Sequence, residues 1–122
     1  MSMKNPEENI VLQKTKAFAL RCIKLYKYMV DEKREFVISK QVLRSGTSIG
    51  ANVKEALRGQ SRADFAAKMN IALKEASETE YWLEILNETD YIDKGLFESI
   101  YSDCTELIKI LMSITKTQKC DS

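Results

Sequence analysis

Apolar residues recur along this chain at intervals of three, four or seven, the spacing that places side chains on one face of an α-helix. The first such segment opens with Pro6 and two acids, which suit the first helical turn and the helix dipole. Its apolar face is formed by Val11, Phe18, Cys22, Leu25 and Met29. We therefore predict a helix over residues 6–30.

A second helix is predicted over residues 35–58, after a charged connection at residues 31–34. Two adjacent apolar seams run along it, the first containing Ile38, Val42, Ile49 and Ala56 and the second Leu43, Gly46, Gly50, Val53 and Leu57. Two seams indicate contact with two neighbouring helices. Each glycine costs up to about 1 kcal/mol relative to alanine in a helix, so Gly46 and Gly50 predict a close approach of a neighbouring helix.

Two further helices are predicted over residues 62–88 and 94–117. Gly59 ends the second helix and Ser61, with Asp64 three places later, caps the third, so a tight turn joins them. Four helices of similar length with short connections predict an all-α fold, an antiparallel up-down-up-down four-helix bundle. With a length of 122 residues, the chain 1–122 is expected to be one domain.

The composition argues against catalysis. The chain has no histidine, the commonest general base and a very common metal ligand. We predict that the protein is not an enzyme and has no cofactor, metal site or small-molecule substrate. Cys22 and Cys104 fall within the apolar pattern, as reduced core thiols do. The chain start is not apolar, and no run approaches membrane-spanning length, so we expect a cytoplasmic protein that is not bound to a membrane.

Polar residues form a stripe along the second predicted helix, namely Gln41, Ser45, Ser48, Asn52 and Glu55. Buried polar groups need hydrogen-bond partners, and a structural network is the favoured explanation because no histidine is present to activate Ser48. An enzyme built on Ser48, Asn52, Glu55 and Glu78 is the least favoured function. The sequence leaves open whether the stripe is structural or functional.

Charge is distributed unevenly along the sequence. Residues 1–74 carry fifteen Lys and Arg against seven Asp and Glu, whereas residues 75–122 carry four against eleven. The first two helices therefore offer a basic face that is suited to phosphates. Its candidate nucleic-acid contacts are Lys14, Arg21, Lys24, Lys40, Lys54 and Arg58. The alternatives are an ordinary solvated face, or self-association in which the basic surface of one subunit meets the acidic surface of the next.

Tyr81 and Trp82 are adjacent in the third predicted helix. Neighbouring residues in a helix point about 100° apart, so the two rings cannot both face the same line of the core. Aromatic side chains are enriched in the centres of protein interfaces. The pair is therefore a candidate oligomer contact.

The residues from Gln41 to Ala56, followed by Asp64–Phe65, Lys74–Ala76 and Tyr81–Leu83, resemble a known family. The likeness is to the 23S rRNA intervening-sequence proteins, which are related to the accessory variability protein of diversity-generating retroelements, and it covers about residues 10–117. It implies an up-down bundle that assembles as a homo-oligomeric ring, often a pentamer, without known catalysis. The positions that match the family signature are Arg44, Ser48, Asn52, Glu55, Asp64 and Phe65.

These observations lead to one primary prediction and one alternative. The primary prediction is a non-enzymatic, homo-oligomeric four-helix bundle whose partner is RNA, or a nucleic-acid enzyme, bound through the basic face of the first two helices. The alternative is a purely structural self-assembling module with no nucleic-acid role. The retroelement relatives are described as basic proteins, whereas this chain has a net charge of +1.

Overall fold

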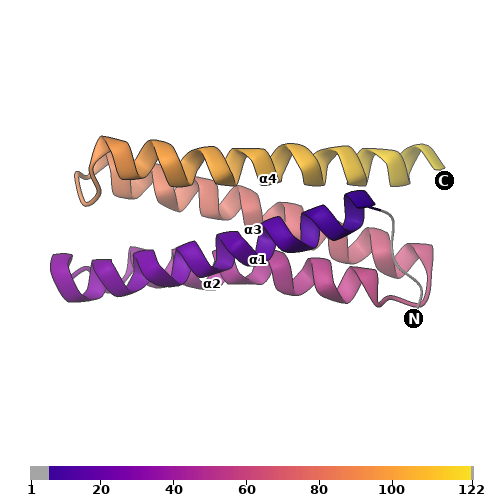
Figure 1. The fold of residues 1–122 in the computed structure, drawn as a ribbon, viewed down its shortest axis with the longest axis horizontal. Helices are drawn as coiled ribbons and strands as arrows, with labels where there is room; N and C mark the ends of the chain where they lie inside the picture. Colours follow the sequence, from indigo (N-terminus) through magenta and orange to yellow (C-terminus); the bar gives the residue numbers. More distant parts are fainter. Residues whose placement is uncertain (1–5, 122) are drawn as a thin grey trace.

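The computed structural model describes residues 6–121, and side chains from residue 10 to residue 117. It contains helices α1 (Pro6–Tyr28), α2 (Ile38–Leu57), α3 (Arg62–Glu88) and α4 (Lys94–Asp121), with a π-helical turn η1 (Met29–Lys33) after α1. Successive helices run in alternating directions along one long axis (Figure 1). The prediction of an all-α four-helix bundle is confirmed. None of the helices within residues 6–121 combines the length and the apolar content that a membrane span requires.

The core lies between the four helices and is made of the apolar positions of the sequence pattern. Cys22 and Cys104 are buried within it as free thiols. Burial raises the pKa of the Cys22 thiol to about 12 and also raises the pKa of Cys104, so both thiols are protonated at neutral pH. The largest fully buried side chains include Phe18, Met29, Ile49, Met69, Leu83, Leu86, Ile100, Leu107 and Leu111.

The two glycines of α2 allow the close approach that their positions predicted. A Cβ atom at Gly46 would lie 2.3 Å from Cys22 Sγ, and one at Gly50 would lie 3.2 Å from Thr15 Oγ1. Both contacts are with α1. The prediction is confirmed, and α1 and α2 are packed at a separation that only glycine permits at residue 46.

The predicted helix ends around the first connection were wrong. The first helix was expected to reach about residue 30, but α1 ends at Tyr28 and η1 continues to Lys33, after which Arg34 has a left-handed φ of 54°. The second was expected to begin at residue 35, but the Glu35 carboxylate instead accepts the backbone N–H groups of Val37, Ile38 and Ser39 at 3.0, 2.9 and 2.7 Å. Glu35 therefore caps α2. At the other end of the chain, α4 continues beyond residue 117 to Asp121.

The four helices do not pack equally. α2 packs extensively against α1 and α3, and α3 against α4, whereas α1 and α4 touch over a much shorter stretch. α1 is inclined to α4 in Figure 1, and the two diverge towards the end of α1 that leads into η1. The seam between α1 and α4 is consequently the least closed side of the bundle.

Candidate nucleic-acid interface

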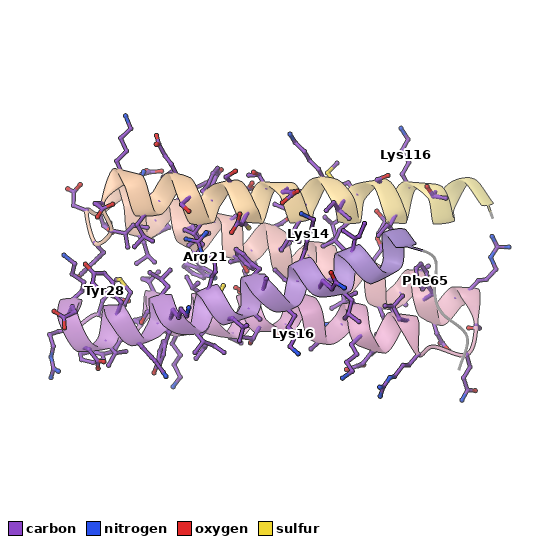
Figure 2. The ribbon with its side chains drawn as sticks, viewed as in Figure 1. Lys14, Lys16, Arg21, Tyr28, Phe65 and Lys116 are labelled. Carbon is purple, nitrogen blue, oxygen red and sulfur yellow. The ribbon has the colours of Figure 1, made fainter. Side chains whose placement is uncertain are left out.

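Two of the predicted nucleic-acid contacts lie in the seam between α1 and α4, where they meet acids. Lys14 Nζ is 3.1 Å from Glu106 Oε2, and Arg21 Nη1 is 2.8 Å from Asp103 Oδ2. Figure 2 shows both basic residues on the side of α1 that faces α4. The basic first half and the acidic second half of the sequence thus partly neutralise each other within one chain.

Arg44 is similarly engaged in the seam between α2 and α3. Its guanidinium lies 3.4 Å from Glu75 Oε1 and also contacts Glu78. The Glu78 carboxylate accepts a further hydrogen bond from Trp82 Nε1 at 3.2 Å. The Trp82 hydrogen bond and the Arg44 charge lower the pKa of Glu78, although burial opposes them. The partner of Glu78 on α2 is therefore Arg44.

The remaining cations of α1 and α2 lie on the outer side of these helices. Six of them are exposed and make no ion pair with any side chain that the structure describes: Lys16, Lys24, Lys27, Lys40, Lys54 and Arg58. We call this set the cationic face. No acid occurs in α1 from Ile10 to Tyr28, and the one acid of α2, Glu55, pairs across to Lys68 Nζ of α3 at 2.9 Å. The α1 residues of the cationic face therefore have no acid from α1 beside them, whereas at the end of α2 Glu55 and Asp64 line the same hollow as Lys54 and Arg58.

The packing register of α1 against α2 determines which cations of the two helices lie at the same level. Because Cys22 lies opposite Gly46 and Thr15 opposite Gly50, antiparallel counting places Lys27 level with Lys40. Along α2, the stripe from Lys40 to Arg58 spans about 27 Å at 1.5 Å per residue. The middle of the face is apolar, with Leu20 and Ile23 exposed by 53% and 36%. In Figure 2, Lys16 extends from α1 on the side away from α4.

Comparison with known proteins shows which family this chain belongs to. Residues 7–113 match the sequence model of the 23S rRNA-intervening sequence proteins. The chain belongs to this family. It is also 59% identical to a crystal structure of a protein of unknown function, from the S23 ribosomal protein family, of Bacteroides thetaiotaomicron. The similarity covers 90% of this chain and 98% of that one, with a TM-score of 0.88. No curated protein matched the chain.

The polar stripe of α2 is occupied by local hydrogen bonds. Ser48 Oγ donates to the Arg44 carbonyl at 2.7 Å, and Asn52 Nδ2 donates to the Ser48 carbonyl at 2.8 Å. Ser45 bonds Thr79 of α3 through their hydroxyls at 2.7 Å, and both residues are buried. Within the described residues there is no cluster of three potential metal ligands. These contacts join α2 to itself and to α3.

The other positions that match the family signature lie at the start of α3. Asp64 donates its backbone N–H to Ser61 Oγ at 3.0 Å, which confirms the predicted cap. Phe65 is half-buried and packs against the core at the same end of the bundle (Figure 2). Asp64 therefore takes part in the cap of α3, and Phe65 packs against the core next to the turn between α2 and α3.

Tyr81 and Trp82 differ in how deeply they are buried. Trp82 is half-buried and packs against the core, whereas Tyr81 is 54% exposed. Their ring centroids are 5.2 Å apart in an edge-to-face arrangement. The Trp82 indole N–H donates to Glu78, and the Tyr81 ring lies against this hydrogen-bonded indole. Tyr81 stays a candidate for an interface between subunits.

Proposed function

We propose that the protein is a non-enzymatic binding module that holds RNA through the cationic face and works as a homo-oligomer in the cytoplasm. One observation carries the proposal: the cations in the helix seams are paired with acids, whereas the six on the outer face of α1 and α2 are not. A surface of unpaired cations attracts phosphates.

Binding through this face is electrostatic. Lysine and arginine side chains neutralise phosphates and release the counterions condensed on the nucleic acid. Each contact steepens the salt dependence by about one counterion. Phosphate contacts carry no sequence information, so the face itself distinguishes RNAs by shape and charge density rather than by base sequence.

Charge reversal on α2 tests the RNA-binding proposal. The triple variant Lys40→Glu, Lys54→Glu, Arg58→Glu replaces three unpaired cations with acids along one stripe. We expect its affinity for a structured RNA to fall on the order of 100-fold at low salt, with a shallower salt dependence, since at least three phosphate contacts are lost. Fluorescence anisotropy with a labelled RNA hairpin measures both quantities.

A matched control carries the same change in net charge elsewhere. Lys74, Lys109 and Lys116 are exposed lysines of α3 and α4, and Lys116 extends from α4 away from the other helices (Figure 2). Their replacement by glutamate should leave most of the affinity intact. Equal losses in the two triple variants would mean that only total charge matters, which contradicts an interface on the cationic face.

Assembly is a separate prediction. Tyr81 offers an exposed aromatic side chain, and the likeness to the family implies a ring of subunits, often five. Sedimentation equilibrium should therefore give a multiple of the 14.0 kDa chain mass. Tyr81→Glu should weaken assembly, whereas Tyr91→Glu, at a tyrosine exposed after α3, should not. A monomer mass across micromolar concentrations at moderate salt would rule out the oligomer.

A purely structural assembly without RNA is the second candidate. It is favoured by the net charge of +1 and by the pairing of Lys14, Arg21 and Arg44 within the chain. One measurement distinguishes the two candidate functions. An oligomer that produces no anisotropy change with hairpin RNA at tens of micromolar protein in low salt would favour the structural module.

A further inference from the structure

A groove lies between α1 and α4, where the two helices diverge. Its volume is about 430 Å³, and it is lined by Arg21, Lys24, Leu25, Tyr28, Leu96 and Ile100. Leu25 and Ile100 belong to the buried core and Leu96 is half-buried. The groove therefore combines an apolar floor with an aromatic ring and two cations.

The ion pair between Arg21 and Asp103 bridges α1 and α4 at 2.8 Å and closes the seam at this level. One turn further along α1, Lys24 is exposed and makes no ion pair with any described side chain, and Tyr28 is 39% exposed. Figure 2 shows Tyr28 and Arg21 on the side of α1 that faces α4. The Tyr28 ring is further approached by Lys33 Nζ, 5.9 Å from its centroid.

The lining selects a ligand by its chemistry. No acid lines the groove, so an anionic group is favoured there. The aliphatic floor and the tyrosine ring suit a flat, weakly polar body, and nucleobases stack on aromatic side chains irrespective of sequence. Because Arg21 already pairs with Asp103, the charge available for a phosphate is that of Lys24 in the lining, with Lys33 near the Tyr28 ring as a second cation.

The groove is also continuous with the cationic face, because Lys24 belongs to both. A strand whose phosphates lie along the cationic face passes the mouth of the groove at Lys24. Single-stranded loops, bulges and ends supply bases that are not already stacked in a duplex. An unpaired base therefore has both an electrostatic route to the groove and a surface on which to stack.

We propose that the groove receives one unpaired base of the bound RNA, with the Tyr28 ring stacked on the base and the Lys24 ammonium contacting its phosphate. This inference rests on the proposed function and deepens it by naming the substrate class. The preferred RNA is one with an unpaired nucleotide in a loop, bulge or end. A continuous duplex engages only the cationic face.

Hairpin RNA with 2-aminopurine at a loop position, compared with a duplex of equal length, tests the proposal on the full-length protein. The wild-type protein should bind the hairpin roughly tenfold more tightly than the duplex and quench the 2-aminopurine, since one stacked base is gained. Tyr28→Leu keeps an apolar side chain but removes the stacking surface. It should bring hairpin affinity down to duplex affinity, remove the quenching, and leave duplex affinity unchanged.

Two control variants accompany this experiment. Tyr28→Phe keeps the ring and should retain the preference for the hairpin. Tyr91→Leu makes the same substitution at a tyrosine that does not line the groove, and it should also retain the preference. Circular dichroism of each variant checks that the bundle is folded.

The outcomes separate the two proposals. Suppose that the α2 charge-reversal variant binds both RNAs more weakly, while Tyr28→Leu changes neither the ratio of hairpin affinity to duplex affinity nor the 2-aminopurine quenching. The groove is then not the base-binding site, and RNA binding by the cationic face is still supported. If the charge-reversal triple binds both RNAs as the wild type does, the proposed function fails. Tyr28-dependent binding of oleate without any 2-aminopurine response would assign the groove to a lipid carboxylate and overturn the inference.

Discussion

Gly46→Ala is expected to lower the free energy of unfolding by about 1–3 kcal/mol, the usual cost of overfilling a packed core. The added Cβ would lie 2.3 Å from Cys22 Sγ and 3.0 Å from Cys22 Cβ. Cys22 is completely buried, so its side chain has little space to move away. Alanine has a higher helix propensity than glycine, by up to about 1 kcal/mol. The clash therefore has to cost more than this gain for the variant to be destabilised. Urea denaturation followed by circular dichroism measures the difference.

Two comparisons isolate the contact. In a Cys22→Ala background the sulfur is gone, and Gly46→Ala should then cost much less, which a double-mutant cycle reports as a coupling energy. Gly50→Ala is a milder case, because its Cβ would first meet Thr15 Oγ1 at 3.2 Å. A Gly46→Ala protein as stable as the wild type would show that α1 and α2 separate at little cost.

Glu35→Ala is the second large effect, with an expected loss of about 2 kcal/mol in the free energy of unfolding. The Glu35 carboxylate is the acceptor for three backbone N–H groups at the start of α2, and the last of these belongs to the buried Ser39. Alanine leaves these donors without that partner. Thermal unfolding by circular dichroism measures the loss, and Glu98→Ala, at an exposed acid of α4, is the matched control with little expected effect.

The same carboxylate predicts a dependence of stability on pH. Burial acts to raise the pKa of Glu35, but the backbone donors of Ile38, Ser39 and Val37 outweigh it and hold the pKa below the usual value of 4.5. A group whose pKa is lower in the folded protein stabilises the fold above its unfolded pKa and loses this contribution as the pH falls through the folded pKa. The wild type should therefore lose stability below about pH 4.5 more steeply than Glu35→Gln. If the free energy of unfolding of the two proteins fell equally steeply as the pH is lowered, the role of the Glu35 carboxylate as a helix cap would be contradicted.

The apolar periodicity was sufficient to predict four helices, their order and most of the core. It failed between α1 and α2 because the ends there depend on a side-chain cap and a left-handed residue. Glu35 reaches forward to three N–H groups, and Arg34 reverses the chain at a φ of 54°. Neither the cap nor the left-handed residue is revealed by the spacing of apolar residues. Such local hydrogen bonding determines where a helix starts without altering the pattern of its faces.

For the candidate site, the sequence predicted the basic face but not which cations remain unpaired. Lys14 lies three residues after Val11 and four before Phe18, and Arg21 lies likewise between Phe18 and Leu25. Both positions flank the core stripe, which indicates the border with a neighbouring helix. Which acids occupy that border depends on the arrangement of the bundle. The groove beside Tyr28 was not predicted, because it depends on how α1 inclines to α4.

The seam between α1 and α4 also bears on how the chain folds. The other helix pairs are consecutive and meet when a short loop closes, whereas the Arg21–Asp103 and Lys14–Glu106 pairs join residues 82 and 92 positions apart. Closing such long segments carries the larger entropy cost, and exposed ion pairs return only about 0–1 kcal/mol each. We therefore expect this seam to form late in folding and to open first in partial unfolding. The inner sides of the first and last helices then become accessible to water while the three consecutive helix pairings persist.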